Sequence, residues 1–230
     1  MFSRSRRRNA GEWLSWMRCI SSWMMTLSMA AGLAIMAFGV AFSIKASLGT
    51  SPISSVPYAT ACVSGLSVGT TTIIMNCIFV LMQILILRRR YQWFQLLQIP
   101  AAVVFGTMID LGALALAPLP AGGYALQWLL CAVGILLVAL GVSVEVAAGL
   151  VTTAGEGVVL AICQVLPVRF GAMKVIFDVT LVCLSVAIGL VFLGRVEGVR
   201  EGTVAAALLV GLLTRRFQKP VEALRRRCLA

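Results

Sequence analysis

Long apolar runs separated by short polar segments make up most of the chain. A run of about 18 or more apolar residues is long enough to cross the hydrocarbon core of a bilayer as a helix. We expect such helices at residues 22–44, 70–87, 91–117, 124–146 and 171–194, with a shorter one at 203–213. Two further segments, 53–66 and 151–166, are apolar but too short for a core of about 30 Å. The pattern predicts an all-α, polytopic helical membrane protein with about six full spans and two short interrupted helices.

The composition agrees with a membrane protein and argues against metal, haem and enzyme chemistry. Sixty per cent of the residues are hydrophobic and only 12% are charged. The chain has no histidine, and none of its seven cysteines forms a C-x-x-C motif, so a zinc or haem site lacks its usual ligands. No Ser/His/Asp set, phosphate-binding glycine loop or catalytic carboxylate pair is recognisable. We therefore expect no cofactor, reduced cysteines and no enzymatic activity.

The net charge of +11 is concentrated in three clusters. They are the N-terminal cluster (Arg4, Arg6, Arg7 and Arg8), the central cluster (Arg88, Arg89 and Arg90) and the tail from Arg215 to Arg227. Basic clusters beside membrane spans mark the cytoplasmic side. Nucleic-acid binding also produces basic clusters, but these flank apolar runs, so we expect no nucleic-acid partner. The first apolar run is longer than the 7–15 residues of a signal peptide, which predicts an uncleaved span and a cytoplasmic N-terminus.

The central cluster discriminates between two topologies. If both short segments cross the membrane, the chain has eight spans and Arg88–Arg90 lie outside, against the positive-inside rule. If both are re-entrant, the chain has six spans, and both termini, Arg88–Arg90, Arg169 and Lys174 lie inside. The charges favour six spans. A compact bundle whose short helices tilt or stop early is the alternative.

The segment from residue 30 to residue 80 recurs without a gap 102 positions later. Matching pairs include Gly32 with Gly134, Gly39 with Gly141, Gly69 with Gly171, and Asn76 with Asp178. Six spans would place an odd number of crossings in each copy, which makes the repeat inverted, a common plan among secondary transporters. We therefore divide the chain into a basic cytoplasmic segment (1–21), a first membrane repeat (22–119), a second membrane repeat (120–217) and a basic cytoplasmic tail (218–230).

The two interrupted segments are the first candidates for a functional site. Leu48–Pro52 and Leu150–Glu156 combine hydroxyl groups with glycine or proline, and non-helical backbone at membrane depth must be buried in protein or line a wet cavity. On the six-span topology one segment enters from each side, so they can meet near the midplane. We expect a substrate or ion pathway there, and ordinary interfacial loops are the alternative. The candidate residues in the two segments are Thr50, Ser51, Ser54, Tyr58, Thr152, Thr153 and Glu156.

Asn76 and Asp178 lie seven residues after equivalent glycines, about 10 Å along a helix. A charge at that depth points to a bundle interior, an ion or a substrate route. However, Lys174 precedes Asp178 by one helical turn and can neutralise it, and Asn76 can simply hydrogen-bond between helices.

One other polar position, Gln98, completes the candidates, and three acidic residues have separate expectations. We expect Gln98 to face the interior, and a buried Glu156 can take up a proton. Glu145 and Asp110 lie nearer to span ends, where we expect solvated, structural roles.

Several short motifs, in order, resemble those of a known family. They are Leu48-Gly49-Thr50-Ser51-Pro52, Gly69 with Asn76, Gln98-Ile99-Pro100 leading to Phe105-Gly106 and Ile109-Asp110, and Gly202-Thr203 before Leu208-Leu209-Val210-Gly211. Over residues 30–218 the chain resembles the YczE/YyaS/YitT family of bacterial integral membrane proteins. The resemblance implies a multi-pass protein of the bacterial inner membrane and transfers no catalytic or binding residue. The second copy has Val151-Thr152-Thr153-Ala154 in place of Gly-Thr-Ser-Pro, so a site between the copies is asymmetric.

These observations lead to a functional hypothesis with two alternatives. The first is a small secondary transporter or permease for a small molecule or ion, with its site between the two short helices. The alternatives are a membrane scaffold or accessory protein that assists another enzyme or complex, and a substrate-binding subunit energised by a separate partner. The lipid bilayer is the one partner that the sequence predicts directly. A second copy or a partner protein is left open, as are the substrate and the coupling ion.

Overall fold

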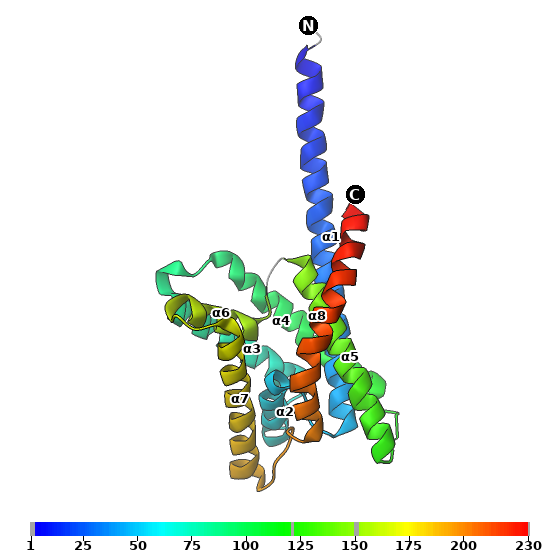
Figure 1. Cartoon of the computed structure of the whole chain (residues 1–230), viewed down its shortest axis with the longest axis vertical. Helices are drawn as coiled ribbons and strands as arrows, with labels where there is room; N and C mark the ends of the chain where they lie inside the picture. The colour runs from blue at the N-terminus through cyan, green and yellow to red at the C-terminus, as the bar shows by residue number, and fades with distance from the viewer. Residues whose placement is uncertain (1–2, 121, 150–151, 230) are drawn as a thin grey trace.

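The computed structural model describes residues 3–120, 122–149 and 152–229, and within them the side chains of residues 25–223. The described residues form helices and turns, with no strand among them (Figure 1). The α-helices are α1 (Ser3–Ala46), α2 (Pro52–Ser64), α3 (Val68–Leu87), α4 (Gln98–Leu116), α5 (Tyr124–Ala148), α6 (Ala154–Val165), α7 (Phe170–Ile188) and α8 (Glu201–Leu229). Short 3-10 turns at Arg88–Arg90 (η1) and Trp93–Leu97 (η2) lead into α4, and a π-helical turn at Gly189–Leu193 (η3) ends α7.

Five helical segments of the described chain are long and apolar enough to cross a membrane. They are Met25–Ala46, Val68–Arg90, Trp93–Leu116, Tyr124–Ala148 and Phe170–Leu193. These segments agree with the five long spans expected from the sequence. The expected sixth span lies in α8, which is longer than the predicted 203–213 and becomes charged in its second half, so the count of six stays a prediction.

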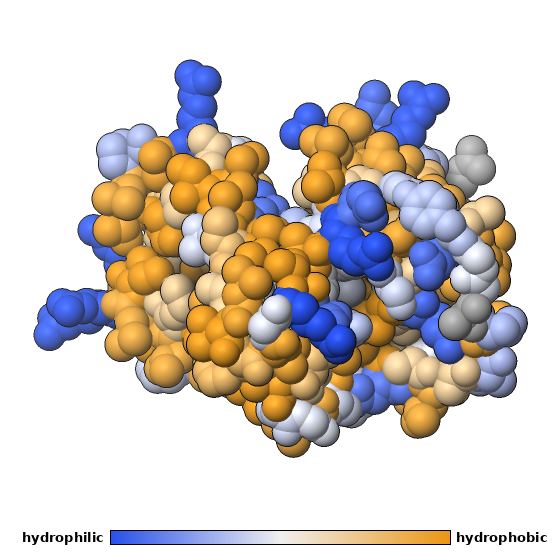
Figure 2. All heavy atoms as spheres, turned by 90° about the horizontal axis from the view of Figure 1, so that it is seen from below, coloured by the Kyte–Doolittle hydropathy of each residue, from blue (hydrophilic) through white to orange (hydrophobic). Residues whose placement is uncertain are grey.

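Large apolar side chains cover most of the outer surface, as expected for helices surrounded by lipid. Leu85, Leu114 and Val191 are among the most exposed, and in the view from below apolar residues dominate the face of the molecule (Figure 2). Water would oppose this exposure, whereas lipid tails favour it. The structure is therefore consistent with an integral membrane protein.

Proline and glycine set the limits of α2, the first of the two short helices. In α2, Pro52 occupies the first turn, where a missing N–H costs nothing, and Gly65 ends the helix with a φ of 72°. Pro57 lies inside the helix, and its carbonyl accepts a hydrogen bond from the Thr71 hydroxyl of α3 at 2.9 Å. With 13 residues in α2 and 12 in α6, both are too short to span. Of the second interrupted segment, Leu150 and Val151 lie outside the described residues.

Helices α1 and α5 make a close backbone contact. A Cβ added to Gly39 would lie 2.8 Å from the Gly134 carbonyl oxygen, and one added to Gly141 would lie 2.7 Å from the Gly32 carbonyl oxygen. Small residues let helix axes approach this closely in membranes. These four glycines form what we call the glycine seam.

The other helices attach to the seam helices through α4 and α8. Helix α4 packs on α1, and α8 packs on α5. Helix α3 packs on α4 and α6, and α2 packs on α7 and α3. Both chain termini lie at one end of the molecule, whereas the α4–α5 and α7–α8 connections lie at the other (Figure 1).

We predict that Gly39→Ala in the glycine seam destabilises the protein by about 1–3 kcal/mol, because the new methyl group would meet backbone that cannot move aside. The measurement is the thermal unfolding midpoint of the purified protein in detergent. Gly211→Ala in α8 is the matched control, since its Cβ would have no neighbour within 4 Å and alanine gains about 1 kcal/mol of helix propensity. Equal midpoints for the two variants would contradict a tightly packed seam.

Candidate functional site: a cavity between two short helices

The N-termini of α2 and α6 meet inside the bundle. Gly155 of α6 packs directly against the side chain of Ile53 in α2. Neither N-cap residue, Ser51 or Thr153, uses its side chain to cap its own helix. Instead, the Ser51 hydroxyl donates to the Ser54 hydroxyl at 3.1 Å. Two helix ends that carry partial positive charge therefore remain without a side-chain cap at one place.

A cavity of about 560 Å³ lies at this meeting point, and all eight α-helices contribute to its lining. Much of the lining is apolar, with Met36, Met75, Phe79, Phe105 and Phe170 among the contributors. Arg215 and Gln218 of α8 also line it, so the cavity extends toward the end of the molecule that carries the C-terminus. Its volume falls within the range of about 300–1,000 Å³ that is usual for small-molecule sites.

Eight of the ten residues predicted from the sequence line this cavity: Ser51, Ser54, Asn76, Gln98, Thr152, Thr153, Glu156 and Asp178. The other two, Thr50 and Tyr58, are not among the lining residues. Thr50 is buried below the α2 N-terminus, where its N–H donates to the Gly198 carbonyl at 3.0 Å. A Cβ on Gly198 would touch the Tyr58 ring, which places Tyr58 in the same contact between α2 and the α7–α8 connection.

The structure shows how the two deep polar positions are satisfied. Lys174 forms an ion pair with Asp178 at 2.8 Å on the same face of α7, and each side chain is about a quarter exposed. Asn76 donates from Nδ2 to the Thr72 carbonyl of its own helix at 2.9 Å rather than to another helix. Both still face the cavity, but each already has a partner within its own helix.

A buried glutamine pair fixes the start of α6. Gln83 donates from Nε2 to Gln98 Oε1 at 2.8 Å and to the Ala154 carbonyl at 3.0 Å. Gln98 is 3% exposed, and its Nε2 has no hydrogen-bond partner among the described residues. Gln83 was not among the sequence candidates, because an isolated glutamine in an apolar run gives no signal of what it will contact.

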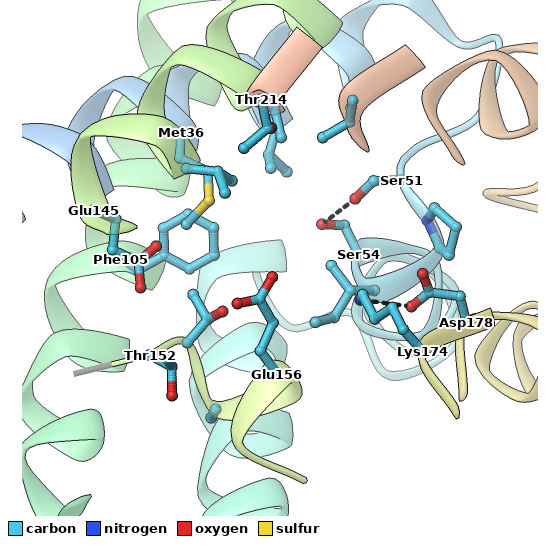
Figure 3. A pocket seen from close by; sticks show the side chains of 18 of the residues that line it. Met36, Ser51, Ser54, Phe105, Glu145, Thr152, Glu156, Lys174, Asp178 and Thr214 are labelled. Atoms are coloured by element: carbon cyan, nitrogen blue, oxygen red, sulfur yellow. Dashed lines mark hydrogen bonds and ion pairs between the residues drawn. The ribbon is translucent and has the colours of Figure 1, made fainter. Parts of the chain in front are cut away.

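Glu145 corrects the expectation of a solvated, structural residue near a span end. It is 4% exposed and lines the cavity. Near the end of α5, its backbone lies against Gly32 of α1, and its side chain points to the cavity beside Phe105 (Figure 3). The sequence held one signal of this burial. The equivalent position in the first repeat, Ser43, is also a polar residue within an apolar run, and it is buried too.

Asp110, in contrast, is held in a structural role. Its carboxylate accepts from the Ser67 hydroxyl at 2.7 Å and from the Gly69 N–H at 2.8 Å, which ties α4 to the start of α3.

The cavity carries more acidic than basic side chains. The acidic residues of the lining are Glu145, Glu156 and Asp178, and the basic ones are Lys174 and Arg215. Lys174 is already paired with Asp178. Neither glutamate forms a salt bridge within the described residues. In the same part of the chain, no cluster of three or more His, Cys, Asp or Glu side chains has the arrangement of a metal site.

We predict that Lys174→Met lowers stability by about 1–3 kcal/mol, because Asp178 loses a charge-assisted hydrogen bond and the cavity keeps its carboxylates. The double change Lys174→Met with Asp178→Asn should recover much of this loss, since removing both members of a partly buried pair is tolerated better than removing one. Thermal unfolding of the single and double variants measures both effects. A double variant no more stable than the single one would show that the pair is not a structural unit.

Comparison with known proteins gives one family. No curated protein and no solved structure matched the chain. A model of a family of unknown function (DUF6198) matches residues 23–219, which include every residue that lines the cavity. This match covers most of the chain, and the protein therefore belongs to the DUF6198 family.

Proposed function

We propose that the protein is a small secondary transporter whose substrate binds in the cavity between the N-termini of α2 and α6. The observation that carries the proposal is the convergence of two short helices, from different halves of the chain, on a cavity lined by all eight helices. Broken helices whose ends face a shared site are the usual construction of transporter binding sites. The proposal assigns no enzymatic activity to the chain.

Pairs of equivalent contacts support an inverted repeat. Gly32 lies against Gly141, which is the repeat equivalent (the mate) of Gly39. Gly39 lies against Gly134, which is the mate of Gly32. The same holds away from the seam. Gln83 of α3 lies against Gly157 of α6, and their mates are joined by a hydrogen bond of 3.0 Å from the Ser185 hydroxyl of α7 to the Ser55 carbonyl of α2. A pseudo-two-fold axis through the seam relates these contacts.

The two halves differ at one interface. Helix α3 packs along α4, with Gly69 against the Gly106 backbone. The equivalent helices α7 and α8 make no comparable contact among the described residues, and a Cβ on Gly171, the mate of Gly69, would have no neighbour within 4 Å. Residues of α7 and α8 line the cavity on this open side.

This difference supplies a mechanism of alternating access. In inverted-repeat transporters, one half opens while the other closes around a fixed central site. Here the α3–α4 side is closed and the α7–α8 side is open. The proposed return movement closes α7 on α8 and separates α3 from α4, while the glycine seam stays in place.

Topology and family resemblance complete the proposal. With six spans and two re-entrant helices, both termini and Arg88–Arg90 lie in the cytoplasm of a bacterial cell, and the cavity opens to the cytoplasmic side. The likeness to the YczE/YyaS/YitT proteins agrees with such a location in the inner membrane.

A scaffold or accessory function is the second candidate. The observation in its favour is that α8 continues as one helix to Leu229, well beyond its apolar part, with Arg215, Arg216 and Lys219 in the extension. A basic helix of this kind offers a surface for a partner protein or for anionic lipid. It does not explain a cavity in the centre of the bundle.

We predict that Ser54→Cys, in a variant without the native cysteines, reacts with a charged, membrane-impermeant thiol reagent added to either side of the membrane. Alternation exposes the cavity to each side in turn, and the reaction is measured in right-side-out and inverted vesicles. Thr107→Cys, which is exposed on α4 and does not line the cavity, should be unreactive from both sides because lipid excludes the charged reagent. Reaction of Ser54→Cys from one side only would indicate a static cavity, and protection from both would favour the scaffold.

Topology is tested separately. Arg89→Cys should be labelled by an impermeant reagent in inverted vesicles and not in intact cells with a permeabilised outer membrane, since the positive-inside rule places η1 in the cytoplasm. Strong labelling from the periplasmic side would exclude the six-span arrangement.

A further inference from the structure

The polar groups of the cavity are divided between two sides. In the close view, Glu145 and Glu156 lie on the side of α5 and α6, and Ser51, Ser54 and the Lys174–Asp178 pair lie on the side of α2 and α7 (Figure 3). Phe105 and Met36 lie beside Glu145. A bound molecule therefore meets an acidic side, an apolar surface and a side rich in hydroxyl groups.

The acidic side lacks a cation of its own. Lys174 is held by Asp178, and Arg215 is an exposed side chain on the charged half of α8. An ionised carboxylate in a largely apolar cavity is costly unless a positive charge joins it. A protonated amine on a ligand would supply that charge together with N–H donors for Glu145 and Glu156.

Other residues of the cavity are hydrogen-bond donors and require an acceptor on the ligand. Gln98 Nε2 is a buried donor with no partner among the described residues, and it belongs to a side chain that lines the cavity and is 97% buried. The α2 N-terminus adds a helix end without a side-chain cap. A carbonyl or carboxylate oxygen on the ligand would accept from the α2 N-terminus, and from Gln98 Nε2 once that side chain turns toward the cavity.

We propose that the cavity binds small apolar compounds that carry a protonated amine and a nearby carbonyl or carboxylate, as apolar amino acids and their amides do. This inference rests on the proposed transport function and names its substrate class. Glu145 and Glu156 receive the amine, Gln98 and the α2 N-terminus receive the acceptor, and the Met and Phe side chains of the lining enclose the apolar body.

Four compounds with one apolar skeleton test the charge requirement. L-phenylalaninamide is a cation, L-phenylalanine a zwitterion, N-acetyl-L-phenylalaninamide neutral and N-acetyl-L-phenylalanine an anion. Each is titrated against the purified full-length protein in detergent, and the thermal unfolding midpoint is recorded, because a ligand of the folded state raises it. We expect the two free amines to raise the midpoint and the two acetylated compounds to leave it unchanged at the same concentration.

Two variants assign the preference to the proposed residues. Glu145→Gln and Glu156→Gln should each weaken the response to both amines by roughly tenfold or more, as expected for loss of a charge-assisted hydrogen bond. Both should fold, since neither change breaks a salt bridge within the described residues, and their unfolding midpoints without ligand should equal or exceed that of the parent. Asp110→Asn is the control, because Asp110 is not among the cavity-lining residues and its loss should leave the response unchanged.

Three results would overturn the inference. The first is that all four compounds raise the midpoint equally, or that none of them raises it. The second is a larger rise with N-acetyl-L-phenylalanine than with the amines. The third is that both glutamate variants respond to the amines as strongly as the parent protein does. The proposed transport function is judged by the accessibility of Ser54→Cys, which needs no ligand. Labelling from both sides together with any of these three results would reject the substrate class and leave transport standing.

Discussion

The close contact of α1 with α5 is the constraint on which the rest of the structure depends. In lipid, helices gain little from hiding apolar surface, so association relies on close packing and polar contacts. The glycine seam brings the two backbones together at Gly32–Gly141 and Gly39–Gly134. This approach also brings Glu145 beside Gly32 at the cavity wall. A bulky residue in the seam would separate the two halves and remove the wall that holds the carboxylate.

The two short helices show how a membrane protein can keep broken backbone in its interior. Lipid offers no hydrogen bonds, so every freed group needs a partner in the protein. Near α2, the Thr50 N–H reaches the Gly198 carbonyl and the Gly202 N–H reaches the Leu48 carbonyl. Near α6, Gln83 binds the Ala154 carbonyl. These bonds anchor the non-helical segments to other helices, and the unfilled space beside them becomes the cavity.

The charges of the cavity give the proposed transporter its chemistry. Lys174 is held in an ion pair within α7, and the two glutamates of α5 and α6 form no salt bridge within the described residues. A buried glutamine adds an unused donor on a different helix, α4. Stability alone would favour apolar residues at such positions. A bound solute can instead form the hydrogen bonds and ion pairs that these polar groups lack in the protein alone. This links the energetics of the fold to the proposed function.

The sequence by itself determined the features that depend on local chain properties. Span positions follow from the length of apolar runs, and the limits of α2 follow from Pro52 and Gly65, so both were predictable. The Lys174–Asp178 pair was also predictable as an alternative, because residues four apart on a helix always adjoin. Only the tertiary structure decided that Glu145 is buried, since its exposure depends on α1 and α6 rather than on its distance from a helix end. It also decided that α3 packs on α4 while α7 stands apart from α8. Similar sequences in two copies permit either packing, because such contacts depend on the whole bundle and not on either segment alone.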